Sequence, residues 1–119
     1  RKDQRLIKTM IQVTILKNEK HACVGFRTKG HAGMSEAGQD IVCAAASVLI
    51  INTVNAIDRY TSDETSLVSD DEEGVIEFEL PNSPSERAAL LLDAMILGLE
   101  SIADDENYEQ YIDITFEEV

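Results

Sequence analysis

The feature that most constrains the fold is an apolar stretch in the first half of the chain. Residues 41–51 are all apolar except Ser47, and they lie in an alanine-rich segment, Asp40 to about Ile57, whose pattern predicts a helix. Apolar residues go almost all the way round this helix, so it must be buried on more than one side. One sheet covers one side only, which requires a second helix or a second subunit to cover another. The run is shorter than the roughly 18 residues that span a bilayer, so no membrane partner is expected.

Two strands and a loop precede this helix. Ile11, Val13 and Ile15 alternate with polar residues, and a second alternating run follows at 22–27 after a turn at Asn18-Glu19. A period of two predicts half-buried strands, here joined as a hairpin. Residues 30–38 hold three glycines and no apolar periodicity, which predicts a mobile loop.

Strand signals also follow the helix. A short edge strand is expected around residues 66–68, a longer strand over 75–80, and a final strand near 108–116. Together with the first two, these make about five strands.

A second helix is predicted between the last two strands. Ser83 is expected to be its N-cap, with Pro84 at the first helical position and Glu86 completing a capping box. Apolar residues from Leu91 to Ile102 mark one face. The element order predicts an α+β fold, a mixed α/β sandwich with two helices packed on a mixed or antiparallel sheet.

The ends of the chain suggest a simple domain organisation. Residues 1–9 are basic and precede Met10, so we expect a leader or the remnant of an upstream sequence, followed by a single domain over 10–119. The leader has no apolar core and is not a secretory signal. We therefore expect a cytoplasmic protein whose two cysteines are reduced thiols.

Acidity limits the partners of this domain. Residues 10–119 carry six Lys and Arg against 22 Asp and Glu, a net charge of −16. Such a surface repels nucleic acid and anionic membranes, and it attracts basic peptides or proteins.

Chemistry is most plausible where the glycine-rich loop meets the first helix. His31 lies in the loop, and Asp40, Cys43 and Ser47 follow at positions i, i+3 and i+7, which share one face of a helix. A thiol in the first turn of a helix is expected to have a lowered pKa. A nearby imidazole could act as base and acid, and the helix-start N–H groups, including that of Cys43, could stabilise an oxyanion.

Other interpretations of these residues remain open. A cysteine in an alanine-rich helix is often a small core residue, Asp40 could serve only as an N-cap, and Ser47 could bond back to a helical carbonyl. No metal site is expected, because the spacing of the chain's histidines and cysteines fits no common zinc pattern: His21, Cys23, His31 and Cys43.

The motif resembles that of a known family. The run Gly30-His31-Ala32, then Gly38 and Asp40-Ile41-Val42-Cys43-Ala44-Ala45, then Ser47, is similar to the signature of the ribosomal-processing cysteine proteases (Prp). Eleven residues separate His31 from Cys43, as in that family. The resemblance extends from Met10 to about Phe116.

The resemblance implies a specific function. Members are cytoplasmic, dimeric endopeptidases that remove an N-terminal extension from large-subunit ribosomal protein L-twenty-seven, cutting after an aromatic pair. Carried over to this sequence, Cys43 is the nucleophile and His31 the general base and acid. Asp40 and Ser47 then support the site, and Gly30 and Gly38 are loop hinges. No cofactor is implied, and the expected partners are a peptide substrate and a second copy of the chain.

A function from another class remains possible on sequence grounds alone. The acidic surface is also typical of a non-catalytic, ribosome-associated binding module that holds a basic protein. The two hypotheses differ in the polar stripe at the start of an apolar helix, which a binding module does not need.

Overall fold

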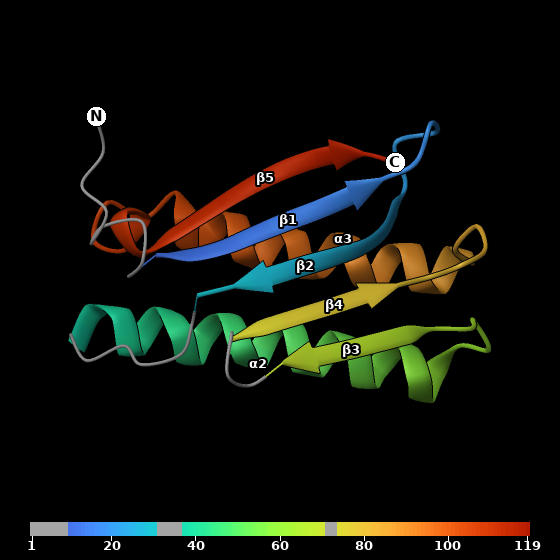
Figure 1. Ribbon diagram of the computed structural model, residues 1–119, viewed down its shortest axis with the longest axis horizontal. Coiled ribbons are helices and arrows are strands. Elements are labelled where there is room, and N and C mark those ends of the chain that lie inside the picture. The colour runs from blue at the N-terminus through green and yellow to red at the C-terminus, as the bar shows by residue number, and fades with distance from the viewer. Residues whose placement is uncertain (1–9, 31–36, 71–73) are drawn as a thin grey trace.

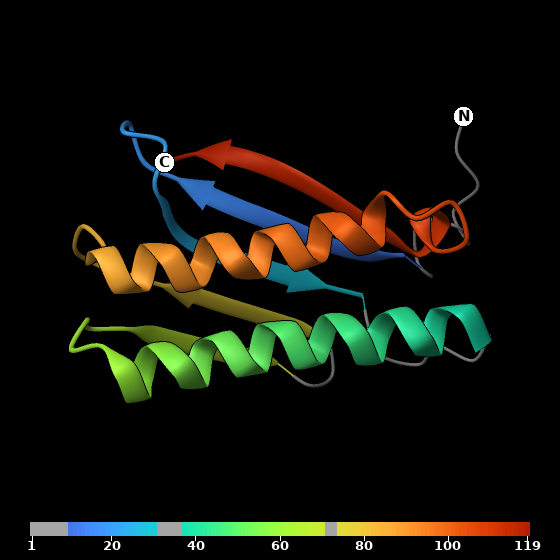
Figure 2. The ribbon, with the colours of Figure 1, turned by 180° about the vertical axis from the view of Figure 1, so that it is seen from behind.

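The computed structural model describes residues 10–30, 37–70 and 74–119. A five-stranded sheet forms one layer, and two antiparallel helices cover one of its faces (Figures 1 and 2). In chain order the elements are β1 (Ile11–Lys17), β2 (Cys23–Lys29), α2 (Ala37–Tyr60), β3 (Ser66–Asp70), β4 (Val75–Glu79), α3 (Glu86–Ala103), a 3-10 turn (Glu109–Tyr111) and β5 (Ile112–Glu118). This arrangement confirms the predicted α+β fold class.

The sheet is mixed, with the strand order β3-β4-β2-β1-β5. β1 and β2 form the predicted antiparallel hairpin, β4 pairs antiparallel with both β2 and β3, and β5 runs parallel to β1. The parallel pair is possible because α3 carries the chain back across the sheet before β5 begins. β3 and β5 are therefore the two edge strands.

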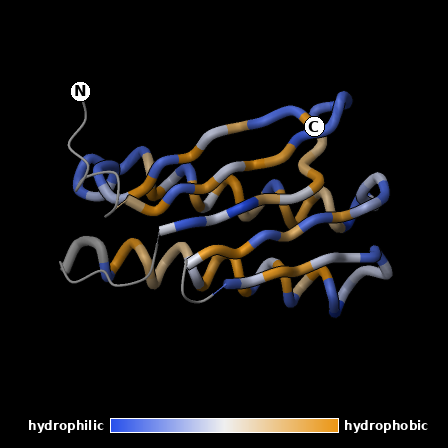
Figure 3. The backbone as a smooth tube through the Cα atoms, in the orientation of Figure 1, coloured by the Kyte–Doolittle hydropathy of each residue, from blue (hydrophilic) through white to orange (hydrophobic). Residues whose placement is uncertain are grey.

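The core lies between the sheet and the helices. Every second residue of β1 is buried, and the rings of Phe26 and Phe78 stack beneath the helices with their centroids 5.3 Å apart. The opposite face of the sheet carries mostly polar residues, and Arg27 and Glu117 form an ion pair across it at 3.6 Å. Hydrophobic residues accordingly occur along β1 and α2, whereas the β1–β2 turn, which lies beside the C-terminus in space, is hydrophilic (Figure 3). The helices contribute these buried apolar side chains: Val42, Ala46, Ile50, Ile57, Ala88, Leu92, Met95, Ile96 and Leu99.

Helix α2 is longer than the sequence predicted, by three residues at each end. Ala37 and Gln39 have good helix propensity, and Asp40 lies in the first turn, where its charge favours the helix dipole. Asp40 therefore follows the start of the helix and is not its N-cap. Gly38 is also inside the first turn, so the predicted loop, whose residues 31–36 lie outside the described residues, ends before Gly38.

The outer surface of α2 is only partly covered. Over Asp40–Tyr60 the helix is long and apolar enough to cross a bilayer, a property that the uninterrupted apolar run did not reveal. The structure packs this helix on the sheet, and α3 lies along one flank, where Gly98 lets Leu49 approach closely. The side chains of Ile41 and Val48, which point away from both, remain more than half exposed. The sheet and α3 thus bury only part of the apolar circumference.

The N-cap of α3 is Ser85, not the predicted Ser83. The hydroxyl oxygen of Ser85 accepts a hydrogen bond from the Ala88 N–H at 3.1 Å, and Asp63 accepts both the Ser85 N–H and its hydroxyl. These bonds hold Ser85 extended and place Glu86 at the first helical position, so Glu86 cannot complete a capping box. A contact with the distant loop at Asp63, which local patterns do not reveal, decides the helix start.

Candidate active site

The two cysteines occupy very different environments. Cys23 is 1% exposed in the core, and its thiol donates a hydrogen bond to the Gly25 carbonyl at 3.3 Å. Burial raises the pKa of this thiol, which keeps it protonated and unreactive. Cys43 is half-buried on α2, at the edge of the core. Of the two, only Cys43 is placed to meet a substrate.

The structure keeps the predicted polar stripe on one face of α2. Asp40 is exposed in the first turn, and Cys43 and Ser47 follow one and two turns later, both half-buried. Because the helix begins at Ala37, Cys43 lies in the second turn. A backbone N–H at that depth bonds to the carbonyl four residues earlier, so the expectation that the Cys43 N–H contributes to an oxyanion hole is wrong.

Only one of the two histidines, His21, lies among the described residues. His21 is exposed in the β1–β2 turn, at the end of the sheet away from the start of α2 (Figure 1). His31 lies outside the described residues, but its chain neighbour Gly30 directly follows β2, which ends on the side of the molecule where α2 starts (Figure 1). His21 is therefore away from the end of the molecule that holds Cys43, whereas Gly30, the residue before His31, lies at that end.

Gly30 has a conformation that other residues rarely adopt. Its φ is +96°, and an added Cβ would lie 2.7 Å from the Met10 carbonyl oxygen. Both constraints act on the residue that precedes His31. The position therefore needs glycine for its backbone, which supports its predicted place at the base of the loop.

A groove continues the stripe along α2. Ile50 and Val54 follow Cys43 and Ser47 at the spacing that keeps them on one helical face. Two adjoining cavities, of about 90 and 240 Å³, share Ile50, Ile51 and Ile76 and lie between α2 and the strands β2, β4 and β3. Local sequence patterns do not reveal the strand residues of this groove, because only the sheet topology places β3 and β4 beside this face of α2.

The floor of the smaller cavity carries an unusual group. Thr28, on β2, is 2% exposed and lines this cavity together with Ser47. Within residues 10–30, 37–70 and 74–119, its hydroxyl is the one buried side-chain polar atom that has no hydrogen-bond partner. A buried hydroxyl without a hydrogen-bond partner lowers the stability of the folded protein, and such hydroxyls are rare in protein cores.

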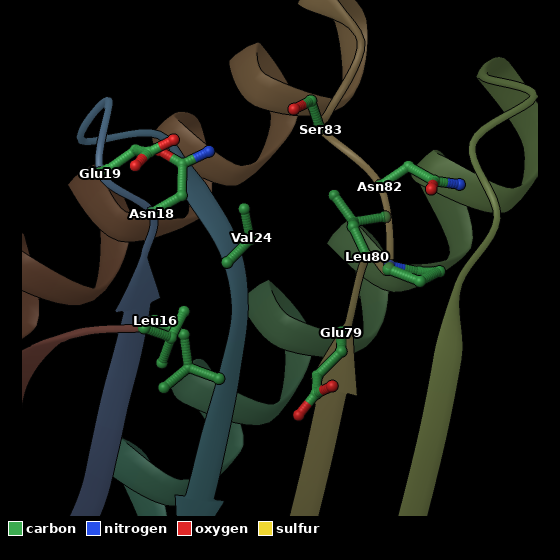
Figure 4. A pocket seen from close by; sticks show the side chains of 10 residues that line it. Leu16, Asn18, Glu19, Val24, Glu79, Leu80, Asn82 and Ser83 are labelled. Atoms are coloured by element: carbon green, nitrogen blue, oxygen red, sulfur yellow. The ribbon is translucent and has the colours of Figure 1, made fainter.

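A larger pocket lies elsewhere and carries none of the predicted site residues. Its volume is about 550 Å³, and Leu16, Val24, Leu80 and Glu79 line it where β1 ends and β2 begins (Figure 4). This end of the sheet is opposite to the start of α2 (Figure 1). The described residues also contain no group of three or more His, Cys, Asp or Glu side chains that could hold a metal ion.

Comparison with known proteins identifies the family of the chain. The family model described as Cysteine protease Prp matches residues 10–113. The chain belongs to this family. Ribosomal processing cysteine protease Prp of Bacillus subtilis (strain 168) is 35% identical over 100 residues, which cover 81% of this chain and 89% of that protein.

Solved Prp structures share the fold. The Staphylococcus aureus protease in complex with a substrate peptide aligns with a TM-score of 0.84 and 30% identity, covering 91% of this chain and all of that one. The S. aureus enzyme with a covalently linked product peptide aligns with a TM-score of 0.80 and 32% identity, over the same shares. This chain is thus a cysteine protease of the Prp family, which decides against the non-catalytic binding module.

Proposed function

We propose that Cys43 is the nucleophile of this protease and His31 its general base and acid. The observation that carries the assignment is the contrast between the cysteines: a cysteine protease needs an accessible thiol, and Cys23 is sealed in the core. The same reasoning selects His31, because His21 lies at the far end of the sheet.

The chemistry then follows the usual two steps of covalent catalysis. His31 takes the proton of the Cys43 thiol as the sulfur attacks the scissile carbonyl carbon, and the imidazolium returns that proton to the leaving amine as the peptide bond breaks. A water molecule, deprotonated by His31, attacks the resulting thioester, releasing the carboxylic acid and restoring the thiol. Asp40, exposed on the same helical face, is proposed to orient the imidazolium of His31. Ser47, one turn after Cys43 on that face, is proposed to support the active site beside the Cys43 thiol.

The proposed substrate is the N-terminal extension of large-subunit ribosomal protein L-twenty-seven, cut in the cytoplasm. Family membership supports this choice, since the B. subtilis relative carries the name ribosomal processing protease and a peptide is bound in an S. aureus structure. The charge of the domain supports it as well. At −16 over residues 10–119, the surface attracts the tail of a basic protein and repels ribosomal RNA.

Cleavage measured by mass spectrometry tests the assignment with matched variants. The extended ribosomal protein is incubated with the parent and with Cys43→Ala, Cys23→Ala, His31→Ala and His21→Ala. We expect Cys43→Ala to abolish cleavage and His31→Ala to slow it by about 10²-fold or more, because general acid–base catalysis contributes that much. The Cys23 and His21 variants should cut at nearly the parent rate. Normal cleavage by Cys43→Ala, or its loss in Cys23→Ala, would refute the assignment.

We further propose that the protein acts as a homodimer through its helices. Four large apolar side chains point outward from the helical layer and are each more than half exposed; this outer helical patch consists of Ile41 and Val48 on α2 and Leu90 and Leu97 on α3. Val48 and Leu97 flank the close approach of Leu49 to Gly98, so the two halves of the patch adjoin. Contiguous apolar surface of this kind is typical of an interface, and a twofold axis lets one patch cover its copy.

Sedimentation at micromolar concentration tests the dimer. Leu97→Glu places a charge in the middle of the outer helical patch and should give a monomer. Val68→Glu, on an edge strand with similar exposure, should leave the dimer intact. A parent protein that sediments as a monomer at this concentration would contradict the proposal.

A further inference from the structure

The groove beside Cys43 has the form of a peptide-binding site. On α2, the residues Cys43, Ser47, Ile50 and Val54 stand at i, i+4, i+7 and i+11, so the proposed nucleophile and the groove lie on one continuous helical face. Eleven residues of helix correspond to about 16 Å. An extended peptide rises about 3.3 Å per residue, so this length accommodates roughly five residues.

The far wall of the groove comes from the edge of the sheet. Leu67 and Ser69 of β3 and Ile76 of β4 line the larger cavity opposite α2. In both ribbon views, β3 and β4 lie over α2 (Figures 1 and 2). Leu67 pairs with the buried Phe78 and therefore faces the helical side of the sheet, yet it is 54% exposed. An apolar side chain that faces the core side and still meets solvent is free to contact an apolar ligand.

Two further observations point to a ligand here. The unpartnered hydroxyl of Thr28 lies at the closed end of the groove, where the packing of β2 against α2 is incomplete. Most residues of the walls are apolar, with Asn55, Ser69 and Asp70 as the polar residues of the larger cavity, whereas the surrounding domain is strongly acidic. This combination suits a peptide that places apolar side chains inside the groove and basic ones outside it.

We propose that the groove between α2 and β3–β4 binds about five extended residues of the substrate beside the scissile bond, and that Leu67 and Ile76 select apolar side chains at those positions. The inference rests on the proposed function, because Cys43 defines the scissile bond. It assigns specificity to residues outside the catalytic motif.

Two neighbouring residues of β3 provide a matched test. Leu67→Gln removes an apolar contact from the groove, and Val68→Gln makes the same kind of change on the opposite face of the same strand, at a residue that is 59% exposed. Both variants are neutral and lie on an exposed edge strand, so the fold and the charge of the domain are retained. Far-UV circular dichroism and thermal melting verify that each variant is folded.

Cleavage kinetics use peptides taken from the N-terminal extension of L-twenty-seven, together with a set in which each apolar residue in turn is replaced by alanine. Leu67→Gln should raise KM by roughly fivefold to tenfold with kcat nearly unchanged, because the lost contact is made equally in the ground and transition states. Val68→Gln should change KM less than about twofold. For one of the alanine-substituted peptides, Leu67→Gln and the parent should have the same KM. The residue replaced in that peptide is then the one that Leu67 contacts.

The reverse change strengthens the test. Ser69→Val extends the apolar wall of the groove and should lower KM by about twofold to threefold. Equal effects of Leu67→Gln and Val68→Gln, or a Leu67→Gln effect that is the same on every peptide, would overturn the proposal.

A binding measurement tests the role of the groove separately from the proposed function. Fluorescence anisotropy with the labelled peptide measures Kd in the Cys43→Ala background, where no cleavage is needed. If the parent cuts none of the peptides, the proposed substrate is wrong, and a Kd weakened about tenfold by Leu67→Gln still supports the groove. An unchanged Kd in that background overturns the groove even if cleavage depends on Cys43.

Discussion

Gly30 offers a sharp test of how the loop that carries His31 is anchored. Its φ of +96° disfavours any residue with a Cβ, at a cost of about 1–2 kcal/mol. The Cβ of alanine would also lie 2.7 Å from the Met10 carbonyl oxygen, so the backbone of Met10 must shift as well. We expect Gly30→Ala to lower the free energy of unfolding by about 2–3 kcal/mol.

The control is the second glycine that the sequence marked as a hinge. Gly38 lies in the first turn of α2, where alanine is the better residue, so Gly38→Ala should stabilise the protein by up to about 1 kcal/mol. If Gly38 instead served as a hinge with a non-helical backbone, alanine there would destabilise the protein as it does at residue 30.

Urea unfolding and peptide cleavage measure the two consequences. Gly30→Ala should lower the urea midpoint, and it should also reduce kcat/KM at temperatures where the variant is fully folded, because the strain displaces the residue before His31. Gly38→Ala should keep the parent's activity. A Gly30→Ala protein as stable as the parent would show that the positive φ and the contact with Met10 do not constrain this site.

Three further predictions concern single groups. Iodoacetamide should label native protein at Cys43 alone, with Cys23 at least about a thousandfold slower until urea unfolds the chain, because burial protects Cys23 and raises its pKa; equal labelling rates would contradict this. Hydrogen bonds from the Ser85 hydroxyl and N–H lower the pKa of Asp63, so its carboxylate contributes stability above the unfolded pKa of about 3.9 and loses it as the pH falls through the lower folded value. The stability difference between the parent and Asp63→Asn, measured by urea unfolding, should therefore shrink below about pH 4, and a difference independent of pH would argue against the pairing. Thr28→Val replaces an unpartnered hydroxyl with a methyl group and should raise the free energy of unfolding by about 1 kcal/mol, whereas a lower urea midpoint would reveal a partner for that hydroxyl.

Local sequence patterns predicted the secondary structure correctly where interactions between neighbouring residues determine it. The alternation at Ile11, Val13 and Ile15 predicted a strand of the core, and the apolar run at 41–51 predicted a helix with more apolar surface than a single sheet can cover. The same run predicted that a second helix or a second subunit covers another side of this helix, and α3 does so along one flank. These properties follow from periodicity, which acts along a few neighbouring residues.

Element ends and the candidate site depended on contacts between distant segments. The N-cap of α3 moved to Ser85 because Asp63, 22 residues away, accepts its hydrogen bonds. The start of α2 at Ala37 removed the Cys43 N–H from the helix terminus, although the stripe of Asp40, Cys43 and Ser47 was predictable from spacing.

The sequence by itself determined the strands, the two helices, the acidic surface and the polar stripe that resembles the Prp motif. Only the tertiary structure decided which cysteine is accessible, because the burial of Cys23 results from packing between β2 and the helices. Only the sheet order placed Leu67 and Ile76 opposite the face of α2 that bears Cys43. The physical reason is common to both: a side chain's accessibility and its neighbours are set by elements that are distant in sequence, and no local pattern records them.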